Sequence, residues 1–333
     1  MKPTSLFFYT LAACTFGAFA APQDNGHAVG AFLERRSKKA VETKEKSKTH
    51  TSAKAKSSGK TSKTEKSSKA SAKSSGKDSK SKKSTKAAAS SKVKVAPTSG
   101  KCVQHSIPFG KGTRVVPYYN YKKSSSGSVD IVDLSGGKKN AYYALGSHGL
   151  EMKLLKPTKG NKLGRGMTFN TTFEFEYGTV SFDMKAAGVP GTVTAGIILA
   201  TGGDEVDIEI TGKDKNAYES NIYLGGHPVF GVFGKKDAIK SSTTDWHTYS
   251  IKRTPSYIEW SVDGKVSRTL KNGPDSMYKG KNHYPYHAGY LQFGIWDASY
   301  PAGTASWAGG PIKWKNIKGG EISAYLRNLK VTC

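Results

Sequence analysis

Residues 205–209, Glu-Val-Asp-Ile-Glu, alternate acidic and β-branched apolar side chains without interruption. A repeat of two is typical of a β-strand, because successive side chains of a strand point to opposite faces of its sheet. All three acids therefore share one face, while Val206 and Ile208 occupy the other. A strand of this kind needs a sheet that buries its apolar face and leaves its acidic face to polar chemistry.

The spacing of the two outer acids predicts a pair of catalytic carboxylates. At a rise of about 3.3 Å per residue, the Cα atoms of Glu205 and Glu209 lie about 13 Å apart. Two Glu side chains that lean toward each other approach the roughly 5–5.5 Å carboxyl separation of retaining glycosidases. Asp207 lies between them and can shift the pKa values of its neighbours. Taken alone, the triplet is also compatible with a solvated strand face or a cation site.

Residues 101–333 predict a single all-β domain. Short runs of alternating or fully apolar residues recur. One of them, residues 258–262, is followed by Asp263-Gly264, which predicts a hairpin turn to the next strand. No amphipathic helix of normal length is evident. Many short strands with Gly-rich turns favour a sandwich or a barrel. The predicted strands include residues 173–177, 258–262, 192–199, 290–296 and 322–331.

The amino-terminal end predicts secretion. Lys2 precedes an apolar run that ends in Ala18-Phe19-Ala20, so we interpret residues 1–20 as a signal peptide. Its cleavage removes Cys14 and leaves Cys102 and Cys333 as an even pair in an oxidising compartment, where a disulfide is expected. No other long apolar run is present, and no membrane anchor is expected.

A long segment between these features has a different composition. Residues 37–100 hold 19 Lys against four acids, with very few branched apolar side chains, and are predicted to be disordered. Residues 21–36, which end in Arg35-Arg36, are a candidate propeptide. Because the chain is expected to leave the cell, we expect anionic wall polymers, phosphorylated glycans or acidic membrane surfaces as partners of the Lys-rich segment, and no nucleic acid. An O-glycosylated stalk and a passive linker are the alternatives.

Aromatic residues predict a glycan groove on the same domain. Trp296 and Trp307 flank a loop rich in Gly and Pro, which favours their exposure, whereas Trp260 follows the inward alternation of a strand and is expected in the core. Sugar rings stack on aromatic planes through their apolar faces. Asn170-Thr171-Thr172 is an N-glycosylation sequon, so a surface glycan is expected at Asn170.

Taken together, these stretches resemble glycoside hydrolase family 16, in particular its fungal branch of Crh-type chitin–glucan transglycosylases of the cell wall. The similarity lies in an ordered series of short motifs rather than in the acid triplet alone. The matching stretches are residues 177–186, 191–195, 204–209, 219–223, 246–249, 254–255, 258–264, 291–296 and 307–310.

The resemblance implies a concanavalin-like β-jelly-roll sandwich that binds chitin and β-glucan across one sheet and needs neither a cofactor nor a metal ion. It implies that Glu205 is the nucleophile, Glu209 the general acid/base and Asp207 the residue that assists the nucleophile. It also implies sugar-contacting roles for Asn221, Tyr223, Gln292, Trp296 and Trp307.

Two positions depart from the Crh pattern. Ile208 stands where a Trp is usual, on the face away from the acids, and residues 297–300, Asp-Ala-Ser-Tyr, replace a Pro-Gly-Gly turn after Trp296. The acceptor of the glycosyl group decides the reaction, because water gives hydrolysis and a glycan hydroxyl gives transfer. A hydrolytic endo-β-glucanase with the same site, or a secreted glycan-binding protein without activity, are therefore the alternatives to a transglycosylase.

Overall fold

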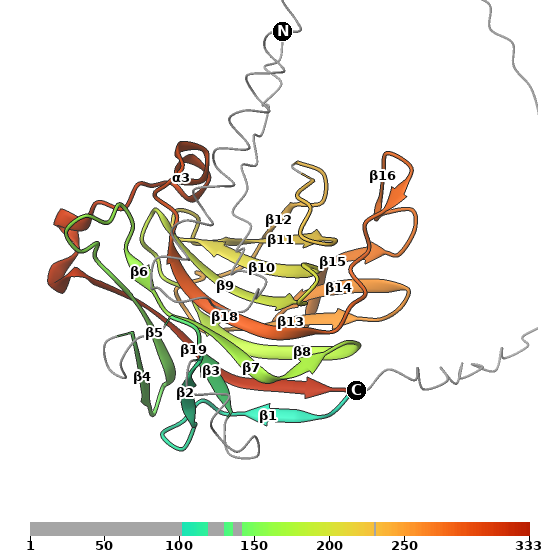
Figure 1. The fold of residues 1–333 in the computed structure, drawn as a ribbon, viewed down its shortest axis with the longest axis horizontal. Helices are drawn as coiled ribbons and strands as arrows, with labels where there is room; N and C mark the ends of the chain where they lie inside the picture. Colours follow the sequence, from blue (N-terminus) through green and yellow to red (C-terminus); the bar gives the residue numbers. More distant parts are fainter. Residues whose placement is uncertain (1–101, 119–129, 136–141, 230) are drawn as a thin grey trace, which may run out of the picture. The chain divides into compact units, whose positions relative to one another are not determined.

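The computed structural model describes residues 102–118, 130–135, 142–229 and 231–333. Two β-sheets pack face to face within these residues (Figure 1), which confirms the predicted all-β sandwich. The predicted signal peptide, the candidate propeptide and the Lys-rich segment 37–100 lie outside the described residues and stay predictions.

One sheet, called the acid sheet here, contains the strand with the three acids. Its strands follow the order β12-β11-β10-β9-β18-β7-β3-β2, and all neighbours are antiparallel except β2 and β3. The bounds are β12 Lys235–Ala238, β11 Ala217–Tyr223, β10 Glu205–Thr211, β9 Thr192–Leu199, β18 Gly289–Asp297, β7 Thr168–Phe175, β3 Ile131–Asp133 and β2 Val115–Pro117.

The second sheet, called the back sheet, has the order β15-β14-β13-β8-β19-β5-β4, with β1 beside β19 and β6 beside β5. A small hairpin of β16 and β17, the short helix α3 and two 3₁₀ turns complete the described elements. The bounds are β15 Lys265–Lys271, β14 Tyr257–Val262, β13 His247–Arg253, β8 Gly178–Lys185, β19 Glu321–Thr332, β5 Gly149–Leu155, β4 Tyr143–Gly146, β1 His105–Ile107, β6 Arg165–Gly166, β16 Met277–Tyr278, β17 Lys281–Asn282, α3 Ala302–Ala308, η2 Trp314–Asn316 and η3 Lys318–Gly320.

The core lies between the two sheets and is rich in aromatic rings. Phe182 of β8 meets Phe293 of β18 edge to face, with 4.8 Å between the ring centres, so this contact joins the sheets directly. Gly196 of β9 makes room for it, because a Cβ atom there would lie 2.6 Å from the Phe182 ring. Trp260 is fully buried, as the sequence predicts.

The hairpin and the disulfide also match the sequence. Asp263 and Gly264 both have positive φ angles, 50° and 76°, and join β14 to β15 in the way that a two-residue hairpin turn requires. Cys102 and Cys333 form the predicted disulfide, with their Cα atoms 5.5 Å apart and a sequence separation of 231. The bond closes the domain where β1 pairs with the end of β19.

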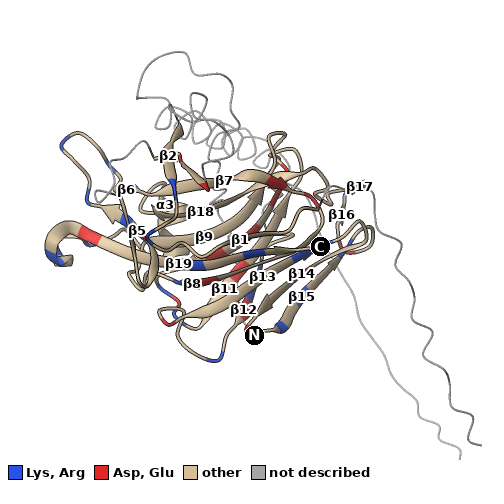
Figure 2. Ribbon diagram, turned by 90° about the horizontal axis from the view of Figure 1, so that it is seen from below, with Lys and Arg blue, Asp and Glu red and all other residues tan. Residues whose placement is uncertain are grey.

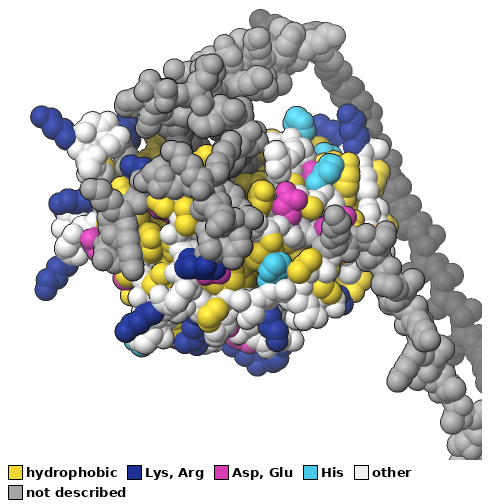
Figure 3. All heavy atoms as spheres, turned by 60° about the horizontal axis from the view of Figure 1, so that its bottom comes forward, with side chains coloured by type: hydrophobic (Ala, Val, Ile, Leu, Met, Phe, Trp, Pro, Cys, Tyr) yellow, Lys and Arg dark blue, Asp and Glu magenta, His cyan; other side chains and the backbone are white. Residues whose placement is uncertain are grey.

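The described surface carries both charged and apolar groups. Lys and Arg recur along the back sheet (Figure 2), where Lys265, Lys271 and Lys330 are exposed. Elsewhere, hydrophobic, His and acidic side chains lie close together (Figure 3), and Tyr286 and Tyr300 are 52% and 46% exposed. Among the helices of the described residues, none is long and apolar enough to cross a membrane.

Candidate active site

Strand β10 separates its side chains as the alternation predicts. Val206, Ile208 and Ile210 are completely buried in the main core between the sheets. Ile208, which departs from the family pattern, therefore points away from the acids. Glu205, Asp207 and Glu209 lie on the other face and are only 3%, 1% and 6% exposed. In the described part of the chain, no group of three or more His, Cys, Asp or Glu is arranged to hold a metal ion.

Strand pairing places two of the predicted sugar-contacting residues beside the acids. Tyr223 of β11 lies directly opposite Glu205, and Asn221 lies opposite Asp207. Paired residues of antiparallel strands point to the same face, with Cβ atoms about 4.5–5.5 Å apart. The amide of Asn221 donates a hydrogen bond to the Tyr223 hydroxyl at 2.7 Å, which fixes both side chains in this position.

On the other side of β10, strand β9 separates the acids from β18. Ile197 of β9 pairs with both Asp207 and Gln292, so that Gln292 lies on the acid face two strands away. The same alternation brings Trp296 to this face at the end of β18. Trp296 packs with Ala195, Ile197 and Leu199 in a small apolar cluster that is separate from the main core.

Trp307 lies on a short helix and reaches the acid face from there, whereas the sequence predicted only a loop beside it. The helix α3, Ala302–Ala308, begins after Pro301 and ends at Gly309, which has a φ of 74°. Trp307 stacks on Trp296, with 6.1 Å between ring centres and 27° between the ring planes. All five predicted sugar-contacting residues therefore lie on or beside the face that carries the acids.

The sequon residue Asn170 also lies on this face. It pairs with Gln292 across β7 and β18, and its Oδ1 accepts a hydrogen bond of 2.6 Å from Gln292 Nε2. The side chain is half-buried. A glycan on Asn170 would be joined to Nδ2 and extend from the acid face, so the expected glycan stays a prediction that conflicts with an open groove.

Burial controls the charge of Asp207. Desolvation raises the pKa of its carboxyl to about 7, although the neighbouring Glu205 carboxyl and the Arg268 guanidinium lower it. In the described part of the chain, neither Asp207 carboxyl oxygen has a partner of ordinary hydrogen-bond geometry. Asp207 can therefore exchange a proton near neutral pH, next to Glu205.

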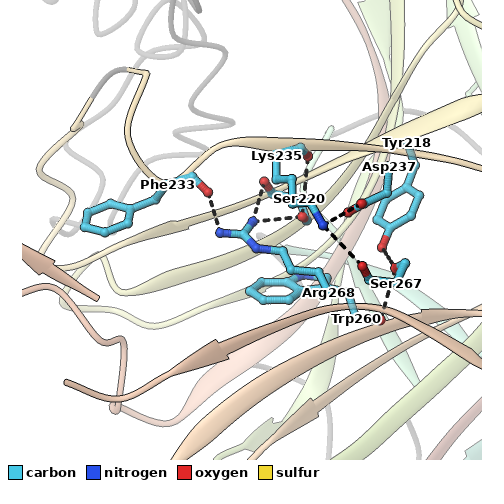
Figure 4. A network of polar contacts seen from close by, with 8 residues as sticks. All are labelled: Tyr218, Ser220, Phe233, Lys235, Asp237, Trp260, Ser267 and Arg268. Carbon is cyan, nitrogen blue, oxygen red and sulfur yellow. Dashed lines mark hydrogen bonds and ion pairs between the residues drawn. The ribbon is translucent and has the colours of Figure 1, made fainter. Parts of the chain in front are cut away.

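A polar network supports the acid strand from inside the sandwich. The indole of Trp260 on the back sheet donates a 2.9 Å hydrogen bond to the backbone carbonyl of Asp207. Arg268 covers the Trp260 ring at 4.5 Å and donates to Ser220 and to the Phe233 carbonyl (Figure 4). The network holds β10 and β11 against the back sheet at the height of the central acid.

Asp204, just before β10, ties two loops to the start of the acid strand. Its carboxylate accepts backbone hydrogen bonds from Gly225, Tyr286 and His287, and a further bond of 2.8 Å from His287 Nδ1. Burial raises the pKa of this carboxyl, but the hydrogen bonds outweigh it and leave the pKa below its usual 3.8. Asp204 is therefore ionised at neutral pH, whereas Asp207, with a pKa of about 7, is only partly ionised there.

Sequence reasoning gave no role to Asp204 or to Glu219, although both lie in stretches that match the family. Glu219 is opposite Glu209 on β11, and its Oε2 accepts a 2.8 Å hydrogen bond from the Trp307 indole. Alternation along 219–223 would have placed Glu219 on the acid face. The partners of Asp204 are far away in the sequence, Gly225 by 21 residues and Tyr286 by 82, so no local pattern shows them.

Comparison with known proteins agrees with this geometry. The family model described as Glycosyl hydrolases family 16 matches residues 130–316, which is more than half of the chain. A solved structure titled Crh5 transglycosylase in complex with NAG superposes with a TM-score of 0.54 and 25% identity, covering 68% of this chain and 83% of that one.

Two relatives are similar over part of their length. Probable glycosidase CRR1 of Saccharomyces cerevisiae is 33% identical over 175 residues, 50% of this chain and 42% of that protein. Crh-like protein 2 of Aspergillus fumigatus is 36% identical over 143 residues, 41% of this chain and 32% of that protein. The chain therefore spans less than half the length of either relative.

The hydrogen bonds that the Asp204 carboxylate accepts from the two loops, called the Asp204 clamp here, predict a pH-dependent loss of stability in Asp204→Asn. Because the folded state lowers the pKa of this carboxyl, its stabilising effect is full above the unfolded value of about 3.8 and is lost as pH falls through the folded pKa. Near pH 7 the variant should lose about 2–3 kcal/mol in the free energy of unfolding, measured with urea.

Asp245→Asn is the matched control, since Asp245 is exposed. The stability difference between Asp204→Asn and the natural protein should shrink steadily below pH 4. A loss at pH 7 no greater than that of the control, or a loss that is constant down to pH 2, would contradict the clamp.

Proposed function

Because the chain belongs to glycosyl hydrolases family 16, we propose that it is a retaining glycosidase that transfers glycan chains in the cell wall. The observation that supports this most strongly is the single buried row of Glu205, Asp207 and Glu209 on β10. Strand pairing surrounds the row with amide, hydroxyl and aromatic side chains. The predicted signal peptide and the disulfide between Cys102 and Cys333 fit an extracellular place of action.

In the first step, Glu205 attacks the anomeric carbon of the bound glycan. The bond from that carbon to the leaving oxygen breaks, and Glu209 donates its proton to this oxygen. The result is a glycosyl group bound covalently to Glu205 and an ionised Glu209. The two Glu lie at opposite ends of the acid row, with one residue of the same face between them, so they can act on opposite sides of the scissile bond.

In the second step, ionised Glu209 removes a proton from the acceptor hydroxyl, which attacks the glycosyl group and releases Glu205. The configuration at the anomeric carbon is retained after two displacements. Asp207 assists in both steps. With a pKa of about 7 it can donate a proton toward Glu205 when that carboxylate leaves the sugar, and withdraw it when Glu205 must attack.

Unused polar atoms support the binding of a polyhydroxylated ligand. Across the described residues, Gln292 Oε1 and Trp296 Nε1 are buried without a hydrogen-bond partner. Buried polar groups normally have partners, so each of these is a candidate site for a sugar hydroxyl. The stacked rings of Trp296 and Trp307 offer the apolar surface that a pyranose ring covers.

Chitin is the donor that we propose, with β-glucan as an acceptor. A protein similar to this chain is titled Crh5 transglycosylase in complex with NAG, the sugar unit of chitin. The Asn221–Tyr223 pair and the Asn170–Gln292 pair give the acid face amide groups on both sides of the acids. Such amides can both donate to and accept from sugar hydroxyls. Hydrolysis of β-glucan at the same site is the second candidate.

Azide rescue should separate the roles of the two Glu. Glu205→Ala and Glu209→Ala should each lose roughly 10²–10⁴-fold or more in turnover of glycan substrates. The azide experiment uses an aryl glycoside as the donor. Added azide should give Glu205→Ala a glycosyl azide of inverted configuration and Glu209→Ala one of retained configuration, because azide attacks the sugar directly in the first case and the glycosyl-enzyme in the second.

Glu321→Ala is the control, since Glu321 is an exposed carboxylate of the back sheet and should keep normal turnover. Near-normal turnover in either active-site variant, or the opposite pairing of azide products, would refute the assigned roles.

The transfer assay decides between the candidate functions. The purified natural protein is incubated with chitin oligomers and labelled β-glucan oligomers, and the products are sized. Transfer predicts labelled hybrids longer than the acceptor. Shorter glucan products alone would establish hydrolysis instead, and binding without any product would leave a glycan-binding protein.

A further inference from the structure

A fourth carboxyl group lies beside the acid row. Glu219 of β11 is the cross-strand neighbour of Glu209, at the end of the row that faces the two stacked Trp rings. Directly paired residues have Cβ atoms about 4.5–5.5 Å apart, and two like charges in such a pair are unfavourable. A chain that keeps Glu219 at this position therefore bears a cost that calls for a reason.

The position of the Glu219 carboxyl is fixed. Trp307 Nε1 donates a 2.8 Å hydrogen bond to Glu219 Oε2. An indole N–H is only a donor, so the oxygen that it meets must be an acceptor. Trp307 is itself held by its stacking on Trp296, and α3 is tied to the loop after β10 by Lys213, whose Nζ donates to the Ser306 carbonyl. These contacts hold the Glu219 carboxyl beside Trp307, on the strand that pairs with Glu209.

The charges around Glu219 are arranged asymmetrically. Burial raises the pKa of its carboxyl above the usual 4.5, and Asp214 adds to this, although the Trp307 hydrogen bond and the positive charges of Lys236 and Lys213 lower it in part. Lys236 lies opposite Glu219 on β12 and is paired with Asp214. Lys236 is thus on the side of β11 away from β10, where its charge favours ionised Glu219 without lying between Glu219 and Glu209.

The strand neighbours of Glu209 on the acid face are acidic or uncharged. Along β10 its nearest acidic neighbour on the same face is Asp207, with Glu205 beyond it, and the uncharged Thr211 follows on its other side. Across β9 it pairs with Ala195, which brings no charge. Glu219 is the paired residue on β11. Among these neighbours, Glu219 is the acidic residue that pairs directly with Glu209 across the strands, and its carboxyl is held by Trp307.

We propose that Glu219 is a positioning residue for Glu209: its carboxylate, fixed by the Trp307 indole, keeps the proton on Glu209 until the leaving glycosidic oxygen takes it. The inference rests on the proposed role of Glu209 as the general acid. No new bond is involved, since the proton passes from Glu209 to the leaving oxygen as before. Glu219 raises the pH up to which Glu209 still carries that proton.

The test is the pH profile of kcat/KM for a glycan donor. Glu219→Gln keeps the size of the side chain and an oxygen for the Trp307 hydrogen bond, but removes the charge. We expect the alkaline limb to move to lower pH by roughly one unit, as one nearby charge in a partly buried site would produce. Glu219→Met should show the same shift, whereas Glu219→Asp should stay close to the natural profile.

A second donor separates this role from general damage to the site. A dinitrophenolate leaving group departs without protonation, so kcat/KM for a dinitrophenyl glycoside donor does not depend on the general acid. For this donor the limb shift of Glu219→Gln should disappear, while a merely structural defect would reduce both donors alike. Glu321→Gln on the back sheet should leave both profiles unchanged.

The outcomes also distinguish this inference from the proposed function. An unshifted alkaline limb in both Glu219→Gln and Glu219→Met, or an equal shift with both donors, would overturn the role of Glu219 alone. Full turnover of glycan donors by Glu209→Gln would overturn the assignment of the general acid, and with it the function on which the inference depends.

Discussion

The architecture of the site depends on the two-sided packing of β10. Val206, Ile208 and Ile210 fill the core between the sheets, and this burial forces the three acids that alternate with them onto the opposite face. A shift of one residue in the strand register would exchange the two sets and bury the acids in the apolar core. The Trp260 indole, which binds the Asp207 carbonyl, holds the strand in its register against the back sheet.

Environment gives neighbouring carboxyls of this segment different properties. Asp204 accepts three backbone hydrogen bonds and one from His287, so it stays ionised and holds two loops. Asp207, three residues later, is equally buried, and desolvation brings its pKa to about 7. The first carboxyl is thereby structural, and the second is suited to exchange a proton. Both properties follow from backbone position rather than from residue type.

The sequence predicted what depends on short range. Alternation in 205–209 placed the acids and the core residues on their faces, Asp263-Gly264 marked the hairpin, and the two remaining Cys marked the disulfide. It did not predict the Gln292–Asn170 contact or the partners of Asp204, because these depend on how strands far apart in the sequence pair. The seven-residue α3 was missed since so short a helix shows little periodicity.

The central claim is that Glu205 carries the sugar during turnover, and it can be measured directly. Glu209→Ala should form the glycosyl-enzyme from an activated aryl glycoside and resolve it slowly, because no base activates the acceptor. Acid quenching followed by peptide mass spectrometry should then find the added glycosyl mass on Glu205. A glycosyl group on any other residue, or product of inverted configuration with no labelled peptide, would contradict the account.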